Sequence, residues 1–221
     1  MVLAPELRAV FFDLDGTLLD TAPDMVAELN LLLAEESQQP VDYKFARSHV
    51  SNGALGLLSI AFGQMNDRRQ DHLRNRFLEI YATRVSQATT LFPGMSDVLK
   101  HLESTGVIWG IVTNKPASLT EPLLEDLALL QRCACVISGD TLPERKPHPK
   151  PLLHAANMVG VPAEHAVYVG DAERDIQAGK TAGMTTVVAT YGYIEPGIDP
   201  ADWRADHTIE KPRQLLNILQ H

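Results

Sequence analysis

The chain alternates between short, continuously apolar runs and longer segments whose apolar residues recur at helical spacing. Five runs rich in β-branched or aromatic residues are typical of strands buried on both faces: residues 9–13, 107–113, 133–138, 166–171 and 185–190, with a weaker run at 207–209. The segments with helical spacing cover 95–106, 118–130, 149–160 and 172–183. This order of strands and helices predicts an α/β fold with a doubly wound, Rossmann-like parallel sheet.

Residues 21 to about 90 interrupt that alternation, because they contain helical patterns and no convincing strand. The patterns cover 23–36, 54–65 and 70–86. A crossover between neighbouring strands needs far fewer residues than this. We therefore predict an α/β core formed by residues 1–20 and 91–221, with a helical cap inserted at 21–90. An insertion after the first strand lies over the carboxyl ends of the strands, where ligands bind in such sheets.

The composition and charge exclude several classes of protein. The 221 residues are 45% hydrophobic and 21% charged, which is ordinary for a globular protein, and the formal net charge is −9. This charge and the lack of a basic run argue against a nucleic-acid partner. No uninterrupted apolar stretch reaches the length of a membrane-spanning helix, and the N-terminal residues lack the pattern of a signal peptide. We expect no membrane association.

Cys133 and Cys135 are the only cysteines, which are too few for a disulfide scaffold. Their spacing places both on one face of the strand predicted at 133–138. We interpret them as reduced thiols in the core rather than as metal ligands, because few other soft ligands lie nearby in the sequence. A reducing cytoplasm is the expected compartment.

Polar residues suited to phosphate chemistry follow four of the predicted strands. They are Asp13 and Asp15 after the first run, Thr113 and Asn114 after the second, Lys146 in the loop after the third, and Asp171 and Asp175 after the fourth. The carboxyl ends of parallel strands meet at one edge of the sheet, so we expect these groups to converge there. Converging carboxylates repel one another unless a cation lies among them, and an oxygen-rich site with few protein ligands suits Mg²⁺.

The same residues can carry out phosphoryl transfer. Carboxylates, a hard cation, a lysine and a hydroxyl group can bind a phosphoryl group and stabilise its charge. Asp13 can attack phosphorus and form an aspartyl phosphate, while Asp15 protonates the leaving oxygen and later deprotonates a water. Gly16 would let the chain turn sharply past the nucleophile. The expected substrate is a small phosphorylated metabolite.

Four motifs, in this order, resemble those of the haloacid dehalogenase superfamily, and within it the phosphoglycolate phosphatase group: DLDGTLLDT (13–21), VTNK (112–115), RKPHPKP (145–151) and GDAERDIQAG (170–179). The resemblance implies a Mg²⁺-dependent phosphatase with a helical cap after the first strand.

Residue by residue, the resemblance makes Asp13 the nucleophile and a metal ligand, and Asp15 the general acid and base with a metal-binding backbone carbonyl. It assigns phosphate binding to Thr113 and Asn114 and makes Lys146 the group that holds nucleophile and phosphate together. Asp171 would bind the metal. Asp175 would bind it directly or through water, or would support the metal ligands without binding the metal itself. The second aspartate of the first motif, Asp15, distinguishes phosphatases from dehalogenases and makes dehalogenation an unfavoured reaction.

The substrate and the class of protein leave alternatives open. The stretch at 190–216 carries the resemblance that implies N-acetylmuramic acid 6-phosphate as the first substrate, with 2-phosphoglycolate as the first alternative. A sugar phosphomutase uses the same motifs. From a different class, a phospho-acceptor signalling domain combines similar residues but lacks a seventy-residue insertion, and a non-catalytic binding module is the third alternative. Monomer and dimer both remain open.

The segment 47–56 is expected to present specificity residues of the cap. Its candidates for contact with the leaving group are Arg47, His49, Ser51 and Asn52. The alternative is that Ser51 or Asn52 caps the helix that follows. The aromatic residues Phe62, Phe77 and Tyr81 have the spacing of cap core residues, and Asp20 is expected at the hinge into the cap.

Overall fold

The structure is a computed structural model that describes residues 7–219, and its centre is a parallel sheet of six strands in the order β5-β4-β1-β6-β7-β8. Their bounds are β1 (Ala9–Phe12), β4 (Ile108–Val112), β5 (Val136–Ile137), β6 (Ala166–Gly170), β7 (Thr185–Ala189) and β8 (His207–Ile209). Phe12 of β1 is level with Ile111 of β4 and Val169 of β6, so these three strands end together. The predicted doubly wound α/β fold is confirmed.

Helices cover both faces of this sheet, which explains why its strands are apolar throughout. Val10 and Phe12 of β1 point to one face and belong to the cluster that also holds α5 (Met95–Thr105) and α6 (Ala117–Asp126). Ala9 and Phe11 point to the other face, against α7 (Lys150–Met158) and α8 (Glu173–Ala182). A strand with one wet face would carry polar residues at alternate positions.

The segment around the two cysteines differs from the prediction. The helix expected at 118–130 ends at Asp126, and the strand expected at 133–138 is only β5, Val136–Ile137. Cys133 and Cys135 are free thiols that precede β5, so the prediction that they share one face of a strand is wrong. Hydrogen bonds from the backbone of Leu129 and Leu130 to Leu124 O close the helix early, and the following turn uses up residues expected in the strand.

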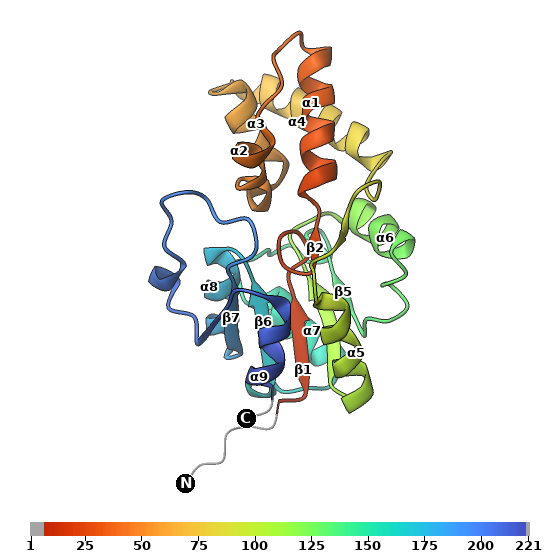
Figure 1. Ribbon diagram of the computed structural model, residues 1–221, viewed down its shortest axis with the longest axis vertical. Helices are drawn as coiled ribbons and strands as arrows, with labels where there is room; N and C mark the ends of the chain where they lie inside the picture. The colour runs from red at the N-terminus through yellow and green to blue at the C-terminus, as the bar shows by residue number, and fades with distance from the viewer. Residues whose placement is uncertain (1–6, 220–221) are drawn as a thin grey trace.

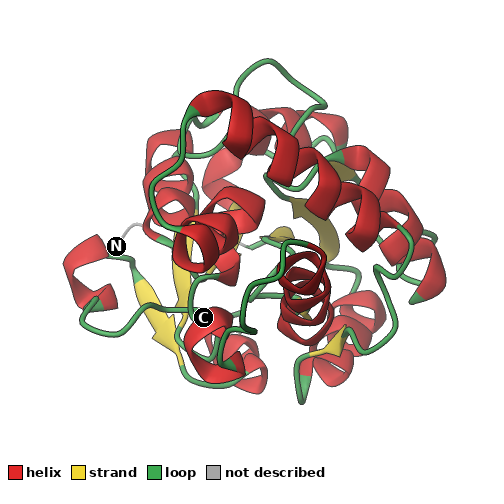
Figure 2. Cartoon of the chain, turned by 90° about the horizontal axis from the view of Figure 1, so that it is seen from above, coloured by secondary structure: helices red, strands yellow, loops and turns green. Residues whose placement is uncertain are grey.

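Four helices lie above the carboxyl ends of the strands (Figure 1). They are α1 (Ala22–Glu35), α2 (Tyr43–Arg47), α3 (Gly53–Phe62) and α4 (Asp67–Ala82), and a 3₁₀ turn, Val50–Asn52, precedes α3. We refer to residues 21–90 as the cap. Figure 2 shows the molecule from this side, with helices in front of part of the sheet. In α4 the buried residues Leu73, Phe77, Ile80 and Tyr81 follow the helical spacing that predicted them.

The chain crosses between the core and the cap twice, and the two crossings are paired. β2 (Leu19–Asp20) and β3 (Thr90–Leu91) form an antiparallel ribbon of two strands that the sequence did not predict. Just beyond it, the buried carboxylate of Asp24 accepts hydrogen bonds from the backbone N–H of Ala88 at 2.8 Å and from the backbone N–H and hydroxyl of Thr89 at 2.8 and 2.6 Å. Asp20 therefore lies at the entry to the cap, within this ribbon.

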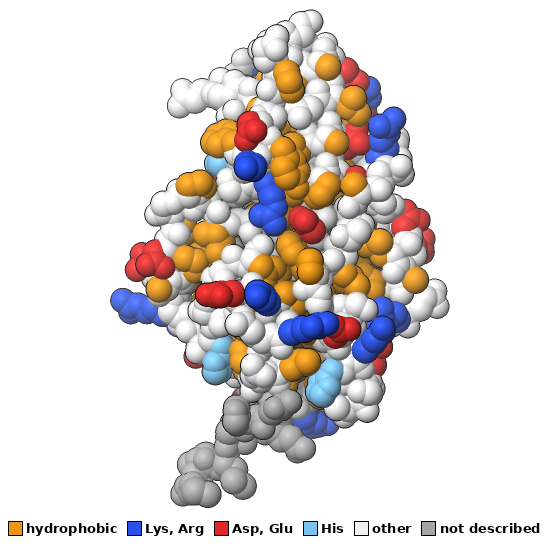
Figure 3. All heavy atoms as spheres, viewed as in Figure 1, with side chains coloured by type: hydrophobic (Ala, Val, Ile, Leu, Met, Phe, Trp, Pro, Cys, Tyr) orange, Lys and Arg blue, Asp and Glu red, His pale blue; other side chains and the backbone are white. Residues whose placement is uncertain are grey.

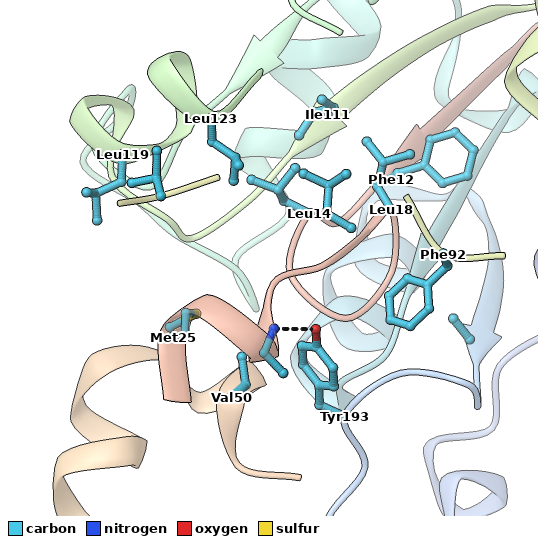
Figure 4. Close-up of a cluster of buried hydrophobic side chains, with 14 of the residues drawn as sticks. Phe12, Leu14, Leu18, Met25, Val50, Phe92, Ile111, Leu119, Leu123 and Tyr193 are labelled. Carbon is cyan, nitrogen blue, oxygen red and sulfur yellow. Dashed lines mark hydrogen bonds between the residues drawn. The ribbon is translucent and has the colours of Figure 1, made fainter. Parts of the chain in front are cut away.

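The apolar core continues from the sheet into the cap. Figure 4 shows Leu14 and Leu18, from the loop after β1, beside Ile111 and Phe92, with Met25 and Val50 of the cap on the far side of the cluster. The dashed line in that figure is the 2.9 Å hydrogen bond from the backbone N–H of Ala22 to the hydroxyl of Tyr193. The cap is thus packed on the core as well as tethered to it.

The surface carries charges of both signs. On the face shown in Figure 3, basic and acidic side chains are interspersed, unlike the continuous basic stripe expected of a nucleic-acid-binding face. Within residues 7–219, no helix is both long enough and apolar enough to cross a membrane.

Candidate active site

Asp13 is the first residue after β1 and meets Lys146 at the edge of the sheet. Both side chains are buried, and Lys146 Nζ lies 2.9 Å from Asp13 Oδ1 and 2.7 Å from Asp175 Oδ1. The same ammonium group donates to the hydroxyl of Tyr168 at 2.8 Å, which in turn donates to Val112 O at 2.7 Å. A buried lysine with two carboxylate partners and one hydroxyl partner is held in a single position.

Three buried carboxylates form a cluster beside this lysine. Single oxygen atoms of Asp13, Asp171 and Asp175 all lie within 4.8 Å of one another. Burial, followed by the negative charges of Asp13 and Asp175, raises the pKa of Asp171 well above its usual value. An all-oxygen set of this size is a donor set that suits Mg²⁺, whose charge would offset the repulsion.

The turn after Asp13 fits closely around Asp171. Gly16 has φ +85°, and a Cβ atom there would lie 2.1 Å from Asp171 Oδ2, so both the backbone angle and the space require glycine. Asp171 also accepts hydrogen bonds from the hydroxyl of Thr17 at 3.3 Å and from the backbone N–H of Tyr193 at 2.8 Å. The chain does turn sharply past Asp13 at Gly16, and the close neighbour of that turn is Asp171.

Thr113 and Asn114 follow β4 and border the same space. The Asn114 side chain accepts from Lys146 N at 3.1 Å and donates to Lys146 O at 3.0 Å. Asn114 therefore fixes the loop that carries Lys146, and both polar ends of its side chain are engaged. The hydroxyl of Thr113 accepts from the backbone N–H of Lys115 at 3.1 Å. Phosphate binding by these two residues stays a prediction.

Asp15 has a partner that sequence reasoning missed, Lys115. Its Nζ lies 3.1 Å from Asp15 Oδ1 and 3.4 Å from Oδ2, and donates to the hydroxyl of Tyr81 at 3.0 Å. Burial alone would lower the pKa of Lys115, but the Asp15 carboxylate and Tyr81 raise it above its usual value. Burial raises the pKa of Tyr81 to about 12, which keeps the phenol neutral. The available signal was the position of Lys115, directly after Thr113 and Asn114 at the same strand end.

Two of the predicted cap residues line the cavity between cap and core and also form hydrogen bonds to core residues. The hydroxyl of Ser51 donates to Asp171 Oδ2 at 2.6 Å, and Asn52 Nδ2 donates to Glu195 Oε1 at 2.6 Å. Neither side chain caps α3, so the capping alternative is not what the structure shows. A second residue absent from the predictions, Arg174, donates from Nη2 to Ser51 O at 2.6 Å and thereby holds the cap turn over the carboxylate cluster.

The other two predicted cap residues lie at the seam between cap and core instead of in the cavity. The guanidinium of Arg47 stacks over the Tyr193 ring at 4.7 Å and lies 3.9 Å from Asp20 Oδ1. His49 Nε2 lies 3.6 Å from Glu195 Oε2. Neither residue lines the cavity described next, and their contact with a leaving group stays a prediction.

A cavity of about 360 Å³ lies between the cap and the edge of the sheet at which the strands have their carboxyl ends. Asp13, Asp15, Thr113 and Asn114 form its floor, and Ser51, Asn52 and Lys115 also line it. Apart from three arginines, the rest of the wall is chiefly apolar and includes Met25, Val50, Ala54, Leu55, Phe77, Leu78, Tyr81, Pro116 and Leu119. Phe77 and Tyr81 were predicted as cap core; both are buried and also border this space.

Two further arginines line the cavity without a carboxylate partner. Among the described residues, neither Arg74 of α4 nor Arg145, next to Lys146, forms an ion pair. Arg76 on the same helix, by contrast, pairs with Glu35 at 2.7 Å. No sequence signal separated Arg74 from its neighbours, since α4 carries several arginines and only the fold shows which one faces the cavity.

The sequence was compared with models of known protein families. Residues 10–189 match the family described as haloacid dehalogenase-like hydrolase. This range extends from β1 to the end of β7 and includes every residue of the carboxylate cluster and both lysines described above. The match therefore covers the whole candidate site.

Several curated proteins and solved structures are similar over nearly their whole length. The chain is 47% identical over 208 residues to a phosphoglycolate phosphatase of Xanthomonas campestris, covering 94% of each protein. It is 38% identical to an N-acetylmuramic acid 6-phosphate phosphatase of Pseudomonas aeruginosa, covering 96% of this chain and 95% of that protein. A crystal structure described as a predicted phosphoglycolate phosphatase from Haemophilus somnus superposes with a TM-score of 0.85 at 26% identity, covering 96% of this chain and 98% of that one.

Proposed function

We propose a reaction on the premise that the chain belongs to the haloacid dehalogenase-like hydrolase family and is a phosphatase. The proposed reaction is hydrolysis of a phosphomonoester through an aspartyl phosphate formed on Asp13. The observation that supports it is the buried group of Asp13, Asp171, Asp175 and Lys146, of which Asp13 lines a cavity that Asp15 also lines. Phosphatase chemistry uses each of these groups, whereas a binding module has no use for a buried nucleophile.

The proposed steps use the two aspartates differently. A carboxylate oxygen of Asp13 attacks phosphorus while the bond to the leaving oxygen breaks, and Asp15 gives its proton to that oxygen. Asp15 then takes a proton from a water that attacks the aspartyl phosphate, which returns Asp13 and releases inorganic phosphate. Lys146, bound to Asp13, neutralises part of the charge on the transferring group, and Thr113 and Asn114 complete the phosphate site.

Mg²⁺ is the proposed cofactor, and the residues present fit it. Asp13, Asp171 and the backbone carbonyl of Asp15 would hold the ion, with Asp175 as a direct or water-mediated ligand. When bound, Mg²⁺ supplies positive charge that stabilises the transferring phosphoryl oxygens. The cap would exclude bulk water from the aspartyl phosphate. Since both cysteines are free thiols, we place the reaction in the cytoplasm.

The first candidate substrate is N-acetylmuramic acid 6-phosphate. The relative from Pseudomonas aeruginosa carries that name, and the cavity supports a leaving group of this kind. About 360 Å³ lies within the range of pockets for whole small molecules and exceeds what a two-carbon acid needs. Its apolar wall suits a sugar ring with an acetyl group, and the unpaired guanidinium groups of Arg74 and Arg145 suit a carboxylate.

The second candidate substrate is 2-phosphoglycolate, which the name of the Xanthomonas campestris relative favours. It also carries a carboxylate and would use the same arginines, but it would leave the apolar wall without contact. The two candidates therefore differ in how much of the cap they touch.

A turnover screen tests the reaction and the substrate together. Purified protein would be given N-acetylmuramic acid 6-phosphate, 2-phosphoglycolate and p-nitrophenyl phosphate, with Mg²⁺ or with a chelator, and phosphate release would be measured. We expect release that requires Mg²⁺ and that is lost in Asp13→Asn but kept in the control variant Asp71→Asn, which changes an exposed residue of α4.

Three outcomes would contradict the proposal. Phosphate release that survives Asp13→Asn would exclude an aspartyl phosphate on Asp13 as the intermediate. Isomerisation of a sugar phosphate without release of inorganic phosphate would indicate a phosphomutase. Turnover confined to 2-phosphoglycolate would overturn the first candidate substrate and leave the hydrolytic mechanism standing.

A further inference from the structure

Each aspartate of the sequence Asp13-Leu14-Asp15 has its own lysine, and only one of the two lysines has a role in the proposed reaction. Lys146 contacts Asp13, whereas Lys115 contacts Asp15. The side chain of Lys115 is 4% exposed, and its ammonium group spans both oxygens of Asp15, at 3.1 and 3.4 Å. Burying a lysine is costly, so a buried lysine with such defined partners calls for an explanation.

The third member of this arrangement comes from the cap. Tyr81 of α4 is 1% exposed and accepts a hydrogen bond from Lys115 Nζ at 3.0 Å. The same ammonium group lies 4.5 Å from the centroid of the Tyr81 ring, a distance at which a cation is attracted to the ring face. Lys115 follows β4 and Asp15 follows β1, so two core segments and one cap helix meet at the ammonium group of Lys115.

We propose that Lys115 and Tyr81 are a pair of positioning residues that fix the orientation of the Asp15 carboxylate, so that the seating of the cap on the core sets the geometry of proton transfer. This inference rests on the proposed role of Asp15 as general acid and base. A general acid acts only within hydrogen-bond reach of the oxygen that it protonates. A displacement of about 1 Å at a reacting group can cost on the order of 100-fold in rate.

A purely structural ion pair between cap and core would give the same contacts but a different kinetic signature. Loss of such a pair would lower the activity on all substrates by one common factor. Loss of acid positioning would instead affect substrates according to their leaving groups, because a weakly basic leaving oxygen departs without a proton and a strongly basic one does not. The dependence on the leaving group therefore separates the two roles.

The experiment uses the full-length protein with Mg²⁺ and a series of aryl phosphates of increasing leaving-group basicity: p-nitrophenyl, phenyl and p-methoxyphenyl phosphate. The measured quantity is kcat/KM, because it reports steps only up to the departure of the phenol. For Lys115→Met we expect a loss of roughly 3-fold with p-nitrophenyl phosphate and roughly 100-fold with p-methoxyphenyl phosphate. Tyr81→Phe, which removes one hydroxyl, should show the same trend at roughly 3- to 10-fold.

Matched controls are Lys150→Met and Tyr43→Phe, which change exposed residues outside the cavity and should leave all three substrates unaffected. Equal losses across the series, or none, in either variant would overturn the inference. If Lys115→Met does not fold, Tyr81→Phe alone decides. Wild-type protein that releases no phosphate from p-nitrophenyl phosphate would instead contradict the proposed function, so the two failures are distinguishable.

Discussion

The floor and the wall of the cavity are built in opposite ways. On the floor and directly behind it, buried charges lie within about one hydrogen-bond length of their partners, as Lys146 does at 2.9 Å from Asp13 and 2.7 Å from Asp175. The wall supplied by the cap is apolar and holds Arg74, which has no carboxylate partner among the described residues. Closely paired charges such as Lys146 and Asp13 have one arrangement and suit one reaction, whereas a cation without a carboxylate partner on a largely apolar wall is available to bind an anionic ligand. The proposed chemistry and the proposed recognition therefore belong to different layers.

The largest expected effect comes from removing Lys146, which lies behind the floor and pairs with Asp13. Lys146→Met leaves the buried carboxylates of Asp13 and Asp175 without their cation, and we expect kcat to fall by about 1,000-fold. Removal of one partner of a buried ion pair should also lower the free energy of unfolding by about 3–5 kcal/mol. Steady-state kinetics and urea unfolding measure the two effects. Lys150→Met, at an exposed lysine that pairs with Glu144, is the control, and a loss of similar size there would contradict the prediction.

A smaller effect is expected on the wall, at Arg74. Arg74→Met should raise KM for a carboxylated substrate by roughly 10- to 100-fold with little change in kcat, since a charged hydrogen bond contributes about 1.5–3 kcal/mol. p-Nitrophenyl phosphate, which has no carboxylate, should be unaffected. Arg76→Met on the same helix is the matched control, because Arg76 pairs with Glu35 on the outside of the cap. An unchanged KM would show that the anion of the substrate binds elsewhere.

The charge of the buried carboxylate cluster can be measured through stability. Burial and the neighbouring carboxylates raise the pKa of Asp171 above its unfolded value of 3.8, so ionisation of Asp171 destabilises the fold. In chelator, this contribution to stability is present at low pH and is lost as the pH rises through the raised pKa. Mg²⁺ binds the ionised form, so its stabilisation should be larger at about pH 8 than at about pH 5.

Thermal unfolding at the two pH values, with and without Mg²⁺, measures this difference. At an ion concentration about 100 times Kd, the gain of about 2.7 kcal/mol corresponds to a rise in Tm of roughly 5–10 °C. The variant Asp171→Asn should lose both the Mg²⁺ effect and its pH dependence. An equal Mg²⁺ effect at both pH values would contradict the prediction.

The smallest kinetic effect is expected at the seam. In the structure Arg47 stacks on Tyr193 outside the cavity, so Arg47→Met should change kcat/KM by less than about 3-fold and lower stability by about 1 kcal/mol. Arg213→Met, at another exposed arginine with a carboxylate partner, serves as the control. If KM instead rose by about 10-fold or more, the sequence-based prediction that Arg47 contacts the leaving group would be supported, and the distinction between seam and wall would be contradicted.

The sequence predicted which groups converge at the strand ends better than which cap side chains line the wall, for a physical reason. Asp13, Thr113, Lys146 and Asp171 follow strands, and a parallel sheet brings all strand ends to one edge whatever the helices do. The direction of a cap side chain depends instead on how four helices pack, which periodicity alone does not specify. Hence Arg47 and His49 lie at the seam, while Arg74 lines the cavity.

Short elements were also beyond sequence reasoning. The ribbon of β2 and β3 has two residues in each strand, which is too few for any period to be recognised. In place of the strand expected at 133–138, the structure has a strand of only two residues, Val136–Ile137, because the preceding turn extends to Cys133. Lys115 was visible at a strand end but had no assigned partner, since Tyr81 reaches it from a helix more than thirty residues away in sequence.

The ribbon of β2 and β3 also bears on how an insertion of this size is tolerated. Closing a loop of about 70 residues costs an entropy of roughly (3/2)RT ln n, or about 4 kcal/mol plus a constant. Here the pairing of Leu19 with Leu91 and of Asp20 with Thr90 brings the two ends of the insertion together next to the core. The two ends of the insertion therefore leave the core side by side, as the strands of a short hairpin do, whatever the length of the insertion. An insertion held in this way can be lengthened, shortened or exchanged without altering the register of the strands beneath it.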